Sequence, residues 1–353
     1  QVSVRIIDIE PFSVQAEEAE QKGIRSRQGQ EIRGGKVSSE EIFLGLVING
    51  ADEVVIPFCD VGLPLEYELT RSIRTAAQED TNRPRIGVLN TDANLYGSFS
   101  FAGGMPRRTP KWQIVRELEK QFDVEQVAGD APIDRNRFDL LIAVLPSSLT
   151  MPQMTNLVSY VKSGRSVLVF DDPLPLDILD RAPRQPKPSP GGGMMGMGRQ
   201  PPPQPKAYGG RATALLDALD LEWNFDEIVW AEYNPHEQFS NLPQEIIFIS
   251  SSTGDGNADS FNNDSAVTSG LQEIVLFFPG CVQAKSDDSD LSHDSLLMTV
   301  TDSGTHRWDN LIESSFGGQM QIRPNPSRTA DEYAQVIAYH VQGDREVTTP
   351  APP

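Results

Sequence analysis

Polar side chains follow three short apolar runs, each bounded by turn signals. The runs are Ile86–Leu89, Phe138–Leu145 and Ser166–Phe170, and segments with helical spacing lie between them at Lys111–Phe122 and Pro152–Lys162. Apolar strands that alternate with amphipathic helices predict a parallel sheet covered on both faces. Ligands of such sheets bind beyond the carboxyl ends of the strands, so the residues at those ends are the candidates for chemistry.

Four strand-end residues are candidate ligand-binding residues: Asn90, Asp92, Asp171 and Asp172. The adjacent carboxylates of Asp171 and Asp172 could hold a hard cation or a sugar hydroxyl. The structural alternative is that one of them caps a turn before Pro173 and the other faces solvent. These strand ends contain no Cys, no His and no glycine-rich phosphate loop, so we predict no catalytic residues.

Two segments contain nucleophilic side chains without the surroundings that a nucleophile needs. The Pro146–Thr150 segment lies between a predicted strand and a predicted helix but lacks the glycines of a nucleophile elbow, so Ser148 or Thr150 is expected to cap the helix. Cys281 resembles the reactive thiol of amidotransferases built on a similar sheet. It has no nearby basic residue, however, and inert packing is favoured.

The sequence predicts no metal site and no cofactor. Three methionines, Met194, Met195 and Met197, could suggest copper because thioethers are soft ligands, but no His or Cys accompanies them. The acidic residues of the loop 250–265 (Asp255, Asp259 and Asp264) lack the alternating spacing and closing Glu of a calcium loop. The four histidines show no spacing that places two imidazoles on one helix face, which favours surface or structural roles.

Composition excludes two classes of partner. The 50 acidic and 30 basic side chains give a formal charge of −20, which disfavours nucleic acid and anionic lipid surfaces. At 353 residues and 38% hydrophobic content the chain can form two or three domains. No apolar run approaches the roughly 18–20 residues of a membrane span.

Residues 1–82 are predicted to form a partial thioredoxin-like α/β unit. The predicted order is a strand at Val4–Ile9, a helix that ends at Gly23, a hairpin of Phe43–Asn49 and Glu53–Phe58, and a helix at Leu65–Ala77. On that helix, Glu68 and Arg71 are expected to form a surface pair. The strand and helix that would carry a redox C-x-x-C are not in this chain, which disfavours a redox role. A chain that opens directly on a strand is expected to be a piece of a longer polypeptide.

Residues 83–347 are predicted to form a flavodoxin- or Rossmann-like three-layer α/β domain with additional C-terminal strands. The Pro-, Gly- and Met-rich segment 181–210 is expected to be a disordered, mobile insertion, because it cannot bury enough apolar surface to offset its ordering entropy. After it, a helix is predicted at Thr213–Leu219. Strands are predicted at Ile228–Ala231, Glu245–Ile249, Glu273–Phe278 and Leu296–Thr301, and Tyr333–Val341 is expected to close the ordered part of the chain. Residues 348–353 read as a linker tail.

Several short phrases, in order along nearly the whole chain, resemble one family. They include Val4-Arg5-Ile6-Ile7-Asp8-Ile9-Glu10-Pro11, Leu65-Glu66-Tyr67-Glu68-Leu69-Thr70-Arg71-Ser72-Ile73, Gly164-Arg165-Ser166-Val167-Leu168-Val169-Phe170-Asp171-Asp172-Pro173 and Ser295-Leu296-Leu297-Met298-Thr299-Val300-Thr301. Together they are similar to the auxiliary subunit of gliding-motility-type ABC transporters, in the uncharacterised ABC-type transport system family. Where that family is usually rich in Gly and His after the first α/β strand, this chain has Asn90-Thr91-Asp92.

The resemblance implies a periplasmic, extracytoplasmic module of a membrane-anchored protein, held by segments outside this chain and working beside an ATPase and a permease. No Walker-type glycine loop is present, in keeping with a subunit that has no ATPase activity of its own. We therefore predict a non-catalytic module that docks to permease and ATPase subunits and could also bind a glycan or peptide at the strand ends. One alternative is a hydrolase or amidotransferase-like enzyme centred on Asp171, Asp172 or Cys281. The other is a purely structural envelope interaction protein.

Overall fold

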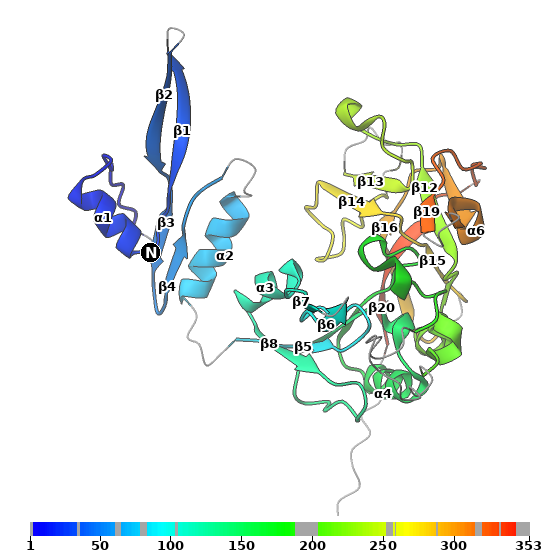
Figure 1. The fold of residues 1–353 in the computed structure, drawn as a ribbon. Coiled ribbons are helices and arrows are strands. Elements are labelled where there is room, and N and C mark those ends of the chain that lie inside the picture. The colour runs from blue at the N-terminus through cyan, green and yellow to red at the C-terminus, as the bar shows by residue number, and fades with distance from the viewer. Residues whose placement is uncertain are drawn as a thin grey trace, which may run out of the picture. The chain divides into compact units, whose positions relative to one another are not determined.

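A computed structural model describes residues 3–33, 36–60, 65–77, 83–102, 105–187, 204–251, 257, 259–286, 289–314, 320–331 and 333–343. The backbone divides into two compact units (Figure 1). One comprises residues 1–84 with 116–123, and the other comprises residues 85–115 with 124–353. Each unit is described by itself.

The first unit contains two helices and two hairpins. They are α1 (Val14–Gln21), β1 (Ser26–Arg33) with β2 (Lys36–Phe43), β3 (Leu46–Asn49) with β4 (Glu53–Ile56), and α2 (Leu65–Ala77). The side chain of Ser13 caps α1 by accepting from the Ala16 N–H, and Gly23 follows the helix with a φ of 86°. The sequence predictions of the α1 helix, the β3–β4 hairpin and the α2 helix are confirmed, whereas a specifically thioredoxin-like assignment stays a prediction.

Two expectations for this unit are wrong. Residues 3–10 form no strand, because this segment pairs with no strand among the described residues, and Val4 and Ile6 are 83% and 87% exposed. Glu68 and Arg71 form an ion pair as expected, but their side chains are only 13% and 8% exposed, so the pair is not a surface pair. The long β1–β2 hairpin was not predicted, because its strands are polar and lack clear alternation.

A four-stranded sheet with the order β10-β9-β5-β8 organises the start of the second unit. Its strands are β5 (Arg85–Leu89), β8 (Asp123–Val127), β9 (Leu140–Val144) and β10 (Val167–Phe170). Strand β9 pairs in parallel with both β5 and β10. The amide of Asp123 donates to the Pro84 carbonyl and that of Asn90 to the Val127 carbonyl, so β8 also runs parallel to β5. The predicted parallel sheet is confirmed.

Helices α3 (Gln113–Glu119) and α4 (Met151–Lys162) provide the predicted connections. Residues of α4 and of α5 (Thr213–Ala218) pack with one face of the sheet in a core that includes Leu141, Ala143, Leu157 and Leu215. Each of those four side chains is at most 2% exposed. Thr150 is the N-cap of α4 in a capping box with Gln153, as expected for this segment.

The opposite face of the sheet is covered unevenly. Ile86, Val88 and Ile142 are buried there, but on β10 Leu168 and Phe170 are 41% and 54% exposed. The expectation of a sheet covered on both faces is therefore wrong at β10, which is an edge strand of this sheet.

The remainder of the second unit consists mainly of antiparallel pairs. Its strands are β6 (Phe99–Ala102) with β7 (Met105–Arg108), β11 (Leu221–Trp223) with β15 (Val282–Ala284), β12 (Glu227–Ala231) with β17 (Ser303–Arg307), β13 (Ile246–Ser250) with β14 (Glu273–Phe277), β16 (Ser292–Met298) with β20 (Val336–Gln342), and β18 (Ile312–Ser314) with β19 (Met320–Ile322); a short helix, α6 (Trp308–Leu311), joins β17 to β18. Alternate side chains of β12 and β13 enter two different apolar clusters, which explains their continuous apolar sequences.

The predicted mobile insertion 181–210 is ordered at both ends, which corrects that expectation. Ala182 and Ala207 are fully buried, and Lys206 is 7% exposed. These flanks fold because they pack on the sheet domain and on each other, an interaction that composition alone does not reveal. Residues 188–203, which include the methionine-rich run, lie outside the described residues.

Candidate functional site

The carboxyl ends of β5 and β9 meet at the point where the connections of the sheet diverge. The chain leaves β5 toward β8 on one side and leaves β9 through α4 toward β10 on the other. In open α/β sheets, ligands bind in the crevice at such a switch point. Of the sequence-predicted residues, Asn90 and Asp92 follow β5, whereas Asp171 and Asp172 follow β10, which is the neighbour of β9.

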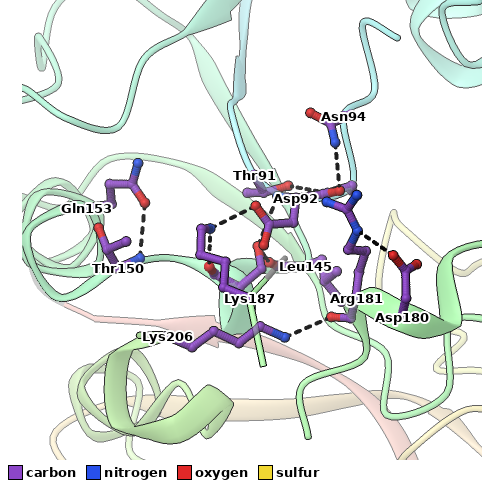
Figure 2. Close-up of polar contacts among 12 residues, drawn as sticks. Thr91, Asp92, Asn94, Leu145, Thr150, Gln153, Asp180, Arg181, Lys187 and Lys206 are labelled. Carbon is purple, nitrogen blue, oxygen red and sulfur yellow. Dashed lines mark hydrogen bonds and ion pairs between the residues drawn. The ribbon is translucent and has the colours of Figure 1, made fainter. Parts of the chain in front are cut away.

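Asp92 lies at this switch point and pairs with a lysine that the sequence did not indicate. The Lys187 ammonium lies 2.7 Å from Asp92 Oδ1 and donates to the Ser148 carbonyl at 2.8 Å (Figure 2). The Asp92 backbone N–H donates to Ser148 Oγ, which joins the end of β5 to the turn after β9. Asp92 Oδ2 is buried and accepts no hydrogen bond from the described residues. Asn90, by contrast, is exposed and accepts from Gln126 on β8.

Asp171 and Asp172 are partly buried and hold different partners. Asp171 accepts from the Ser147 N–H at 2.8 Å and from the Ser147 hydroxyl at 2.7 Å, while Asp172 accepts from the Leu174 N–H at 2.8 Å. Asp172 thus caps the turn at Pro173, as the structural alternative required, but Asp171 does not face solvent freely. Burial raises the pKa of Asp171 to about 7, although the hydrogen bonds from Ser147 oppose this shift. Burial likewise raises the pKa of Asp172 to about 7.

A second unpredicted lysine, Lys206, holds the main chain that leads to Lys187. The Lys206 ammonium donates to the carbonyls of Arg181 at 2.9 Å and Ala182 at 2.7 Å, with the Pro183 carbonyl at 3.5 Å (Figure 2). Burial lowers the pKa of Lys206 to about 8, with Asp92 and Asp171 raising it and Lys187 lowering it. The charges of Asp92, Asp171 and Lys187 therefore act on Lys206. Both lysines come from a Pro- and Gly-rich segment, where no sequence signal separates a buried lysine from a solvated one.

We expect Asp172→Asn to stabilise the protein near pH 8 and to change little near pH 4. Because the folded-state pKa of Asp172 is about 7 against an ordinary 3.8, the folded protein keeps a proton that the unfolded chain has released. The free energy of unfolding therefore falls as pH rises from about 4 to about 7. The asparagine oxygen can still accept from the Leu174 N–H without a charge, so the gain near pH 8 should be on the order of 2 kcal/mol, reduced by solvent that reaches the side chain.

Urea unfolding of the wild type and Asp172→Asn at a series of pH values measures this difference. Asp177→Asn, at an exposed position after the same turn, is the matched control and should change the free energy of unfolding by no more than about 0.5 kcal/mol. A gain of equal size near pH 4 and near pH 8 would show that the carboxylate charge is not its origin.

Cys281 is an inert core residue in this structure. It is 8% exposed and packs with Val229, Ile247 and Val300. Burial and the charge of Glu227 raise the pKa of its thiol to about 11, so the thiol stays protonated at neutral pH. The structure thus gives the amidotransferase-like alternative no activated nucleophile at this position.

In the folded protein, Cys59→Ser should abolish rapid reaction with a water-soluble disulfide reagent at neutral pH, while Cys281→Ser should leave it unchanged. Cys59 is partly exposed and Cys281 is buried, so only Cys59 meets the reagent. The absorbance of the thiolate that the reagent releases follows the reaction. The same measurement on the wild type unfolded in urea gives the total of two thiols. Fast reaction of folded Cys59→Ser would contradict the assignment of Cys281 as inert.

Among the described residues, no group of three or more His, Cys, Asp and Glu side chains is arranged to hold a metal ion. Asp259 and Asp264 use their backbone N–H groups to donate to Asn257 and Asn262 in tight turns, and both residues are exposed. Asp255, Met194, Met195 and Met197 lie outside the described residues.

A buried cluster of charged side chains lies elsewhere in this unit, and the sequence does not predict it. Glu245, at the start of β13, accepts from His306 Nε2 at 2.9 Å and from Arg328 Nε at 3.1 Å. The Glu245 and His306 side chains are 1% and 2% exposed. The members lie far apart in sequence, so spacing could not reveal them. Both carboxylate oxygens of Glu245 accept hydrogen bonds within the cluster, to which we assign a structural role.

Comparison with known proteins gives a family match. The model of a family described as an ABC-type uncharacterized transport system matches residues 83–351, which is more than half of the chain. No curated protein and no solved structure matches the chain. Within the described residues, no helix has the length and apolar character needed to span a membrane.

Proposed function

The chain belongs to the ABC-type uncharacterized transport system family, and on that premise we propose that it is a non-catalytic module that docks to the permease and ATPase subunits of such a system. The family match carries this proposal. It implies an auxiliary component of a transport system at a membrane. We further propose that the chain is the periplasmic part of a membrane-anchored protein whose anchor lies outside this sequence.

The filled switch point supports a non-catalytic role. In enzymes with parallel sheets, this crevice holds the substrate or cofactor. Here Lys187 forms an ion pair with Asp92, and Asp171 accepts hydrogen bonds from the N–H and the hydroxyl of Ser147. Ser147 is fully buried, so its hydroxyl is not presented to a substrate. The chain's own side chains thus take up the positions from which a catalytic group would act.

The uncovered face of β10 is the surface that we assign to docking. Leu168 and Phe170 point to the same face of the sheet as the buried Ile142, but they remain 41% and 54% exposed. An apolar sheet face in an α/β protein is normally covered by a helix. A partner of the transport system that supplies an apolar helix would complete this layer, and exposed apolar patches commonly mark such interfaces.

Photo-crosslinking and affinity recovery from native membranes test the proposal. The tagged wild-type chain should recover an ABC permease and ATPase, identified by mass spectrometry. Leu168→Ser with Phe170→Ser should lose them without a loss of folding. The matched control is Val275→Ser with Phe277→Ser, since these side chains are 39% and 58% exposed on the strand β14. Failure of the wild type to recover either subunit would overturn the docking role, and equal loss in both variants would overturn the assignment to β10.

Two other functions have distinguishable consequences. A hydrolase centred on Asp171 and Asp172 has one observation in its favour, because a carboxyl pKa near 7 suits acid–base chemistry. It requires turnover that Asp171→Asn abolishes. A purely structural envelope protein requires that no glycan, peptide or amine raises the melting temperature, because any ligand that binds only the folded state must stabilise it.

A further inference from the structure

The position of Lys187 carries an inference about the ligand of the strand-end site. Lys187 does not belong to the sheet; it lies beyond the turn 181–185, whose carbonyls the Lys206 ammonium holds. From there its side chain reaches back to the ends of β5 and β9, where it is 20% exposed. The group at the switch point is therefore an ammonium supplied by a connecting segment.

The acceptors at this position suit a primary ammonium group. Asp92 Oδ1 and the Ser148 carbonyl converge on one nitrogen atom at 2.7 and 2.8 Å. A tetrahedral ammonium places separate N–H bonds on two such acceptors, whereas a planar guanidinium is better suited to both oxygens of one carboxylate. The turn after β9 thus contributes to recognition through a backbone oxygen, which a change of side chain cannot remove.

Electrostatics require that this position hold a cation. The Asp92 side chain is only 15% exposed, and its Oδ2 accepts no hydrogen bond within the described part of the chain. Without Lys187, a mostly buried carboxylate would lack its nearest positive charge, which is unfavourable. The nearby Lys206 ammonium is already directed at main-chain carbonyls. When Lys187 is removed, a cation from outside the chain would therefore be stabilised at this position.

We propose that the position between Asp92 Oδ1 and the Ser148 carbonyl, at the ends of β5 and β9, binds a primary alkylammonium group, either a free amine or the lysine side chain of a partner, and that Lys187 occupies this site from within the chain. The proposal goes beyond the proposed function and does not require the docking surface on β10. Lys187 then acts as an internal competitor for this position.

Truncation of Lys187 provides a direct test. Lys187→Ala removes three carbons and the ammonium nitrogen, which are the atoms of n-propylammonium. About 100 mM n-propylammonium chloride should raise the melting temperature of full-length Lys187→Ala by roughly 2–4 °C. The wild type, in which the site is filled, should shift by less than about 1 °C under the same conditions.

Matched variants separate site binding from a general salt effect. Lys120→Ala removes a lysine of the same charge from an exposed pair with Glu117, and it should show no specific gain. Lys187→Met refills the space with an apolar chain and should also show none. Equal stabilisation of Lys187→Ala by sodium chloride or tetramethylammonium chloride, or a response to n-propylammonium in Lys187→Met equal to that in Lys187→Ala, would overturn the proposal.

A peptide distinguishes the two sources of the amine. Acetylated, dye-labelled Gly-Gly-Lys-Gly-Gly should bind Lys187→Ala in a fluorescence anisotropy titration, and its N-acetyl-lysine counterpart should not. Response to both the peptide and n-propylammonium assigns a peptide-borne lysine, and response to n-propylammonium alone assigns a free amine. Response to neither overturns the ammonium site while leaving the recovery of transporter subunits as a separate result.

Discussion

Glu245→Ala is expected to lower the free energy of unfolding by about 3–5 kcal/mol, because it leaves a buried His306 donor and the Arg328 charge without their shared acceptor. Burial alone would raise the pKa of Glu245, but the hydrogen bond from His306 and the charge of Arg328 outweigh it and hold the pKa below its ordinary 4.5. Glu245 is therefore ionised in the folded protein at neutral pH. Its contribution is present above about pH 4.5 and is lost as the pH falls through the lower, folded-state pKa.

The chain contains a matched control for this prediction. His236 and Glu273 form the same type of pair, also at 2.9 Å, but their side chains are 34% and 33% exposed. Glu273→Ala should therefore cost no more than about 1 kcal/mol. Urea unfolding can be followed by fluorescence of Trp230, whose ring centroid lies 6.2 Å from that of His306. If the two alanine variants lose similar stability, burial of the Glu245 cluster is not what makes it stabilising.

The sequence predicts the parallel sheet well because its strands are short apolar runs with clear ends. Ile86–Leu89, Leu140–Val144 and Val167–Phe170 are apolar on both sides of the strand, and Thr150 and Gln153 form a recognisable capping box. It predicts Val4–Ile9 wrongly for a physical reason. Propensity gives this segment an extended backbone, but a strand also needs a partner for its N–H and C=O groups, and no strand in the described part of the chain pairs with it.

The candidate site was predicted in part. Asp92 and Asp171 follow apolar runs that the sequence identifies as strands, so these residues could be found without knowing the order of the strands in the sheet. Their partners could not. Lys187 and Lys206 lie in a segment whose composition predicts disorder, and only the packing of its flanks brings their ammonium groups to the sheet. The same limit applies to Glu245, His306 and Arg328, which tertiary pairing of distant segments brings together.

Lys206 joins the two flanks of the segment 181–210. Its contribution to stability is not evident from the sequence, because the segment around it is rich in Pro and Gly. Its ammonium donates to the Arg181 and Ala182 carbonyls from one flank to the other. Gly210 also brings the two flanks close together. Its φ is 87°, and a Cβ added there would lie 2.1 Å from the Pro183 carbonyl oxygen. The ends of the segment are thus held together by a charge and by a close backbone approach.

Lys206→Met should lower the free energy of unfolding by about 2–3 kcal/mol near pH 7. The methionine stem fills the space but donates no hydrogen bond, so buried carbonyls lose their partner, at about 1–3 kcal/mol for each unsatisfied group. Lys285→Met is the control, since Lys285 forms a more exposed pair with Asp217 and should lose less than about 1 kcal/mol. Urea unfolding at fixed pH compares the two variants with the wild type.

The pH dependence of the free energy of unfolding shows whether Lys206 loses its proton in the folded protein near pH 8 or stays charged. Burial lowers its pKa to about 8 from an ordinary 10.5, so the unfolded chain holds a proton that the folded protein releases. Stability of the wild type should therefore rise between about pH 8 and pH 10.5 relative to Lys206→Met. The neutral amine still has two N–H donors, which match the two shorter contacts to Arg181 and Ala182. A difference between the wild type and Lys206→Met that stays constant over this range would mean that Lys206 remains charged because its carbonyl partners and neighbouring carboxylates outweigh the cost of burial.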